Sequence, residues 1–309
     1  MRLQQLRAAI VAIWVVGGIA TYLFSHQLNI PARIAIPVAA AFLFEVSLYA
    51  GMQAIPWTAP FLWASGSASY LIYSIPTGVF HWHGLLLIAG LTGIAVTWMR
   101  YAKPGLASDA AFLACFTAIY LSHVLDTVYL EPFPKTQTQA LEKLMCFRLA
   151  VTCILQFRSH KDLGFGFIPT REDWWIGLRY FLYLMPVAAL LVHLLHYRSF
   201  GLVPGFWWKA PSTFLAVLWF VGLAEEILFR GVLLHRLRAS MHTIPALLLS
   251  SVAFGLTHLW FTAFPNWKFV IIASVAGLFY GMAYLQARAV RASMVAHAFT
   301  VAAMRTFIA

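Results

Sequence analysis

The chain has 309 residues, of which 62% are hydrophobic and only 10% are charged. Soluble globular domains carry about 25% charged residues, so this composition excludes an ordinary soluble enzyme and predicts a polytopic membrane protein. The net charge of +11 fits the basic cytoplasmic loops of such proteins. Because the sequence has no basic run of the recognition type, we expect no nucleic-acid partner.

About ten apolar stretches are long enough to cross a bilayer, at about 20 residues per crossing. In chain order they lie near residues 8–25, 33–54, 57–75, 82–99, 106–125, 173–195, 212–235, 243–262, 268–287 and 289–308. The short alternating segments of a membrane barrel are not visible in the sequence. We therefore expect an all-α, polytopic transmembrane helical bundle of about 10–11 spans.

The topology follows from the basic residues. The chain begins with a basic, then apolar segment that no small-residue cleavage site follows, which predicts an uncleaved first span with a cytoplasmic N-terminus. Segment 144–157 is short and contains Arg148. If it crosses, the basic clusters near 158–161, 236–238 and 288–291 all fall in the cytoplasm, so we expect a short or tilted crossing. An interfacial helix is the alternative.

We divide the chain into an N-terminal transmembrane region of unknown role, residues 1–143, and a C-terminal core, residues 144–309. The N-terminal region contains an intramembrane Glu45 and a His123/Asp126 pair at helical spacing. Either is a functional hypothesis, with hydrogen bonding between helices as the alternative. The C-terminal core holds nearly all of the other suggestive polar groups.

The segment GLAEEILFRGV, residues 222–232, places three charges inside an apolar run. Each costs about 2.5–3.5 kcal/mol on insertion scales. Glu226 and Arg230 are four residues apart and share a helix face, which predicts an ion pair. Glu225 is turned away from Arg230 by roughly 140° on an α-helix. It is therefore left for general acid or base chemistry, although all three charges could instead serve only to tie helices together.

Two histidines follow in later apolar spans. His258 comes one turn after Phe254 on the same face, and His297 lies in the last span. Counted along the helices from the basic loops, Glu225 is ~20 Å deep, His258 ~25–30 Å and His297 ~10–15 Å, so tilted helices must bring them together. Such a set could ligate zinc. It could instead activate water directly, with one histidine stabilising the oxyanion. The sequence lacks HExxH, so the zinc hypothesis has no local motif behind it.

These motifs resemble the CPBP family of intramembrane glutamic proteases, which includes the CAAX prenyl endopeptidases and the Abi-type proteins. EEILFR (225–230) matches the EExxxR motif of the family, FGLTH (254–258) matches FxxxH, and His297 matches the histidine of the last motif. The resemblance covers roughly 174–309.

The resemblance implies catalytic roles. Glu225 activates the attacking water with help from His258, without a metal or another cofactor. Glu226 and Arg230 hold the helix arrangement, and Phe254 supports the second motif. His297 contributes to the oxyanion hole.

One position departs from the family pattern. The last motif is usually HxxxN or HxxxD, whereas this chain reads HAFTV, with Val301 at the final position. Valine cannot donate a hydrogen bond. Thr300 or a backbone group then supplies the second oxyanion donor, or His297 acts alone, or activity is impaired.

The resulting hypothesis is an intramembrane endopeptidase that hydrolyses a peptide bond of a membrane-associated protein or peptide through Glu/His-activated water. Its partners are that substrate and the lipid bilayer, and we expect it in the bacterial inner (plasma) membrane. Two alternatives stay open. One is a non-catalytic scaffold, immunity or transport protein that uses the same polar cluster, and the other is a zinc-dependent membrane peptidase.

Overall fold

The structure is a computed structural model. It describes residue 31, residues 33–40, residue 43, residues 58–133, 138–158, 164 and 166, and residues 168–308. These residues form helices, with no β-strand among them beyond an isolated bridge between Phe200 and Ile308. The all-α class is confirmed. The predicted first span and Glu45 lie outside the described residues.

Four helices in the described part are long and apolar enough, by length and composition, to cross a membrane. They are Trp82–Tyr101, Arg171–Leu194, Phe206–Arg238 and Trp267–Ala287. Three shorter apolar helices accompany them, at Leu106–Leu121, Leu144–Ile154 and Thr243–Leu256. These helices confirm a polytopic membrane protein, while the total of about 10–11 crossings stays a prediction.

By its contacts the chain forms two compact units, one comprising residues 1–104 and 112–158 and the other comprising residues 105–111 and 159–309. The first contains α3 (Thr58–Ser74), α4 (Trp82–Tyr101), most of α5 (Leu106–Leu121), the 3₁₀-helix η1 (Val124–Thr127) and α6 (Gln139–Phe157). Within it, α4 packs on α3 and α6. The functional division at residue 143 stays a prediction.

The doubtful segment 144–157 lies inside α6. Its Arg148 is only 1% exposed. The guanidinium donates to the Leu62 carbonyl over 3.1 Å and to the Ser65 hydroxyl. Helix α3 thus provides partners for part of a charge that is costly to bury in apolar surroundings. Whether α6 crosses the bilayer stays a prediction.

The predicted His123/Asp126 pair is confirmed at the surface of the first unit. The two side chains meet at 3.3 Å around η1, and each is about half exposed, at 49% and 48%. An ion pair exposed to this degree contributes about 0–1 kcal/mol, so it does little to hold the fold together.

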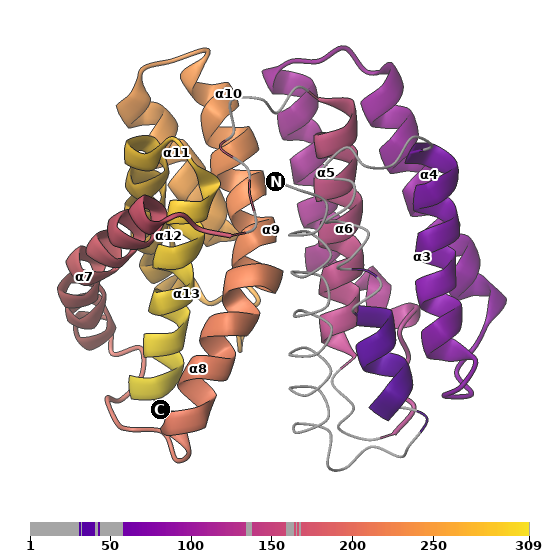
Figure 1. Ribbon diagram of the computed structural model, residues 1–309, viewed down its shortest axis with the longest axis horizontal. Helices are drawn as coiled ribbons and strands as arrows, with labels where there is room; N and C mark the ends of the chain where they lie inside the picture. Colours follow the sequence, from indigo (N-terminus) through magenta and orange to yellow (C-terminus); the bar gives the residue numbers. More distant parts are fainter. Residues whose placement is uncertain are drawn as a thin grey trace. The chain divides into compact units, whose positions relative to one another are not determined.

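The second unit holds the motif residues. Its helices, in order, are α7 (Arg171–Leu194), α8 (Phe206–Ala216), η2 (Val217–Val221), α9 (Gly222–Glu226), η3 (Ile227–Leu234), α10 (His235–Arg238), α11 (Thr243–Leu256), α12 (Trp267–Ala287) and α13 (Val290–Phe307). The segments from α8 to α10 run on as one long helix whose parts η2 and η3 are π-helical. Helix α12 packs on α7, α11 and α13, and α13 packs on α7 and α8 (Figure 1).

The N-terminal cap of α7 and the first turns of the helix determine how α7 packs against α13. Thr170 and Asp173 form a reciprocal capping box that satisfies the first amides of α7. The same Asp173 carboxylate accepts a 2.7 Å bond from Nε of Arg291, in the first turn of α13. Further along, Gly177 lets the helices approach so closely that a Cβ there would lie 2.6 Å from Cβ of Val295. These contacts fix the position of α13 along α7.

Candidate active site

The carboxylate doublet lies where the long helix changes its winding. Glu225 and Glu226 end the α-helical segment α9, and the π-helical segment η3 begins at Ile227. π-helical segments are rare and often occur at functional sites. The predicted ion pair between Glu226 and Arg230 is confirmed: Nη1 of Arg230 donates to Oε1 of Glu226 over 3.0 Å, and both side chains are fully buried.

Arg230 joins the long helix to α12 and α11. Its Nη2 donates to the Gly277 carbonyl on α12 over 3.0 Å. The guanidinium lies 4.5 Å from the ring centre of Phe254 and 5.3 Å from that of Tyr280. These contacts offset part of the cost of burying the cation, as a buried ion pair requires. Arg230 is therefore a packing centre as well as the counter-ion of Glu226.

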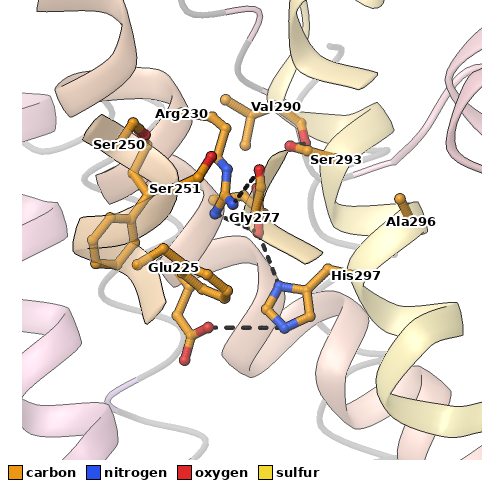
Figure 2. Close-up of polar contacts among 12 residues, drawn as sticks. Glu225, Arg230, Ser250, Ser251, Gly277, Val290, Ser293, Ala296 and His297 are labelled. Atoms are coloured by element: carbon orange, nitrogen blue, oxygen red, sulfur yellow. Dashed lines mark hydrogen bonds and ion pairs between the residues drawn. The ribbon is translucent and has the colours of Figure 1, made fainter. Parts of the chain in front are cut away.

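His297 reaches both carboxylates from α13. Its Nδ1 lies 2.9 Å from Oε1 of Glu226. Its Nε2 lies 3.8 Å from Oε2 of Glu225 (Figure 2). An ionised carboxylate only accepts hydrogen bonds, so the short contact assigns a proton to Nδ1 and directs Nε2 towards Glu225. The sequence motifs predict an oxyanion role for His297, and nothing in them indicates its bond to Glu226.

Aromatic rings hold the His297 imidazole in place. Tyr280 of α12 stacks on it, with ring centres 4.7 Å apart and planes 15° from parallel. Phe254 of α11 meets it edge-on, with centres 5.8 Å apart and planes at 88°. With the side chain of His297 only 5% exposed, the ring has little freedom to rotate. The imidazole is thus preorganised by α11 and α12, together with its bond to Glu226 of α9.

Glu225 differs from its neighbour in its surroundings. Its side chain is 13% exposed, against 0% for Glu226. In both side chains Oε2 is buried, and none of the described residues hydrogen-bonds to it. Oε1 of Glu226, however, accepts bonds from Arg230 and His297. The 3.8 Å separation of Glu225 from His297 is longer than a hydrogen bond. The described ion pairs do not join Glu225 to Arg230, which agrees with the predicted orientation of the doublet.

The other predicted histidine, His258, lies just beyond the end of α11. Its Nδ1 is 3.0 Å from the Phe254 carbonyl oxygen and 3.2 Å from Oγ1 of Thr257. A carbonyl oxygen only accepts, so Nδ1 carries the proton and Nε2 is the basic nitrogen. The rings of His258 and Phe254 are 4.9 Å apart. Phe254 therefore contacts both predicted histidines, as its position one turn before His258 suggested.

Thr300 and the nearby serines are bonded to main-chain carbonyls. Thr300 is buried on α13 and donates to the Ala296 carbonyl over 2.8 Å. Donation to an oxyanion would require that bond to break. Ser250 and Ser251 likewise donate to the carbonyls of Phe229 and Leu247. The carboxylates and imidazoles are therefore better placed for chemistry than any of these hydroxyls.

A zinc site needs three or more converging ligands. In the part of the chain that the structure describes, no group of three or more His, Cys, Asp or Glu side chains has an arrangement that could hold a metal ion. The described residues therefore do not fit a resident zinc.

Residues 206–303 match a protein-family model described as type II CAAX prenyl endopeptidase, Rce1-like. The matched segment begins with α8 and ends inside α13, so it contains every predicted catalytic residue. The match confirms the resemblance to the CPBP family in the C-terminal part of the chain and indicates a membrane protease. No significant match was found among the curated proteins or the solved structures.

Proposed function

Since the C-terminal part of this membrane protein is Rce1-like, we propose that the protein is an intramembrane endopeptidase of the glutamic type. It hydrolyses a peptide bond of a membrane-associated protein or peptide with a water molecule activated by Glu225 and His258. The supporting observation is the approach of His297 Nε2 to Glu225 Oε2, at 3.8 Å. The proposed base and the proposed oxyanion donor thus come from different helices to one place, as they must if both are to reach the same substrate carbonyl.

Glu225 is the proposed base. An oxygen that receives no hydrogen bond from the described protein can accept one from a water molecule. As that water attacks the substrate carbonyl, Glu225 takes its proton and later passes it to the leaving amine. Glu226 cannot take this role as readily, because its side chain is fully buried, whereas that of Glu225 is 13% exposed. In addition, Oε1 of Glu226 already accepts bonds from both Arg230 and His297.

The histidines have complementary proposed roles. His258 helps to position the water by accepting a hydrogen bond at its unprotonated Nε2, while Glu225 takes the proton. His297 stabilises the oxyanion once both of its nitrogens carry protons, since Nδ1–H is held by Glu226 and Nε2–H is then the free donor. Arg230 and Glu226 support this arrangement by fixing the imidazole. Removal of one oxyanion donor costs about 10²–10³ in rate.

The test uses full-length protein in liposomes with a prenylated CAAX peptide as the probe. We expect the wild type to release the terminal tripeptide, and Glu225→Gln and His258→Ala to lose at least about 10²-fold in rate while they retain the fold. Glu131→Gln, an exposed glutamate in the first unit, is the matched control and should keep full activity. Normal cleavage by Glu225→Gln overturns the proposal. Loss of activity after exhaustive chelation, restored by zinc, would favour the zinc peptidase instead.

Val301 favours one other function, a non-catalytic scaffold, immunity or transport protein, because valine leaves the usual oxyanion donor missing. In that case Glu225→Gln leaves the cellular role of the protein unchanged, whereas Arg230→Ala destroys the fold. A complementation assay of these two variants in cells separates the two functions.

A further inference from the structure

A groove lies along α7, and none of the motif residues of the second unit lines it. It has a volume of about 790 Å³ and is lined by α7 from Arg171 to Tyr183, with Gln286 from the end of α12. Ile176 forms part of its lining and belongs to a buried apolar cluster that includes Ala292 of α13. An occupant of the groove would therefore touch the packing between α7 and the helix that carries His297.

The lining of the groove is suited to acyl chains. Only 28% of the apolar stretch of α7 is buried within the protein, against 56% for α12, so α7 turns much more of its surface outwards. Trp175, Leu182 and Tyr183 are 63%, 56% and 55% exposed. Exposed apolar and aromatic side chains on a helix of spanning length are typical of a surface in contact with lipid.

The charged side chains that line the groove favour an anionic ligand. Arg171, Arg179 and Glu172 line it, which gives a net charge of +1. Within the described residues none of the three forms an ion pair. Arg179 lies about 12 Å along the helix axis from Arg171, at 1.5 Å per residue, and so within the apolar part of α7. An exposed cation at that depth is costly unless it reaches an anionic partner.

We propose that this groove binds one anionic phospholipid. Its phosphate lies between Arg171 and Arg179, its glycerol accepts or donates bonds at the Gln286 amide, and an acyl chain follows Ile176 and Leu182. The single negative charge of the lipid balances the net charge of the groove. The lipid thereby supports the α7 surface that packs against α13, a role that does not depend on the proposed catalysis.

Native mass spectrometry of the full-length protein tests this site. The protein in detergent is titrated with phosphatidylglycerol or with phosphatidylcholine of the same acyl chains. We expect one tightly retained phosphatidylglycerol. Arg179→Gln and Arg171→Gln should each lower its affinity about fivefold with little change for phosphatidylcholine, and Glu172→Gln should raise it by a similar factor.

Arg198→Gln is the matched control. Arg198 is also exposed and lies over a neighbouring tyrosine ring at 5.7 Å, much as Arg179 lies over Tyr180 at 5.8 Å, but it follows the opposite end of α7. It should leave both lipid affinities unchanged. Equal retention of the two lipids by the wild type, which indicates annular lipid only, overturns the proposal. So does an equal effect of Arg179→Gln and Arg198→Gln.

Discussion

Arg230→Met tests whether the buried ion pair holds the second unit together. The substitution removes the 3.0 Å bond to Glu226, the 3.0 Å bond to the Gly277 carbonyl and the contacts with two aromatic rings. Methionine fills part of the space with a flexible apolar chain. The main consequence is a fully buried Glu226 carboxylate that keeps only His297 as a hydrogen-bonding partner in the described structure.

The expected loss of unfolding free energy is about 3–5 kcal/mol, the usual cost of removing one partner of a buried pair. The bond to the Gly277 carbonyl is charge-assisted and would by itself account for about 1.5–3 kcal/mol of that loss. Removing both charges, in Glu226→Gln/Arg230→Met, leaves no uncompensated ion. The double variant should therefore be more stable than the sum of the single losses predicts, by about 1–3 kcal/mol.

Reversible unfolding by a denaturing detergent in mixed micelles measures these values for the wild type, the two single variants and the double variant. Arg198→Met, the same substitution at an exposed site, should change the unfolding free energy by less than about 0.5 kcal/mol. A loss below about 1 kcal/mol for Arg230→Met, or strictly additive single losses, refutes the role of the pair as the structural brace of the site.

Three further outcomes follow from the same structure. Gly177→Ala should cost about 1–3 kcal/mol in detergent unfolding, because the new methyl group meets Val295 at 2.6 Å; an unchanged midpoint contradicts the close packing of α7 and α13. Asp173→Asn should lower the same stability by about 1–2 kcal/mol, since it weakens both the helix cap and the bond to Arg291. Val301→Asn should accelerate probe cleavage roughly tenfold by adding an oxyanion donor, while Val301→Ala should not; equal rates for both exclude that position from the site.

Residue spacing along one helix predicted the contacts between side chains that lie one helical turn apart. Glu226 and Arg230 are four residues apart, as are Phe254 and His258, so one helical turn suffices to place each pair. The π-helical winding after Glu226 was not predictable, because it depends on backbone bonds that tertiary packing decides. The bond from His297 to Glu226 joins residues 71 positions apart, a distance over which helical periodicity carries no information.

The relative depths of Glu225 and His297 in the membrane could not be predicted from the sequence. Counted from the basic loops, Glu225 and His297 differed by roughly 5–10 Å, yet their side chains meet at 3.8 Å. The depth estimate assumed that the basic loops at the ends of the long helix and of α13 lie at the same depth in the membrane. Packing on α7 and α12 instead sets how far α13 is shifted along its axis relative to the long helix. By contrast, composition alone was enough for the helical membrane class, because a chain with 10% charge has too little polar surface for a soluble fold.

The central claim is that Glu225 activates water for peptide-bond hydrolysis in the membrane. Membranes that contain the wild type or Glu225→Gln are incubated in ¹⁸O-labelled water, and new carboxyl termini are identified by mass spectrometry. Hydrolysis places one oxygen from water in each new carboxylate, whichever membrane protein or peptide is cleaved. We predict labelled termini with the wild type and Glu131→Gln and none above background with Glu225→Gln. Equal labelling with Glu225→Gln would contradict the claim.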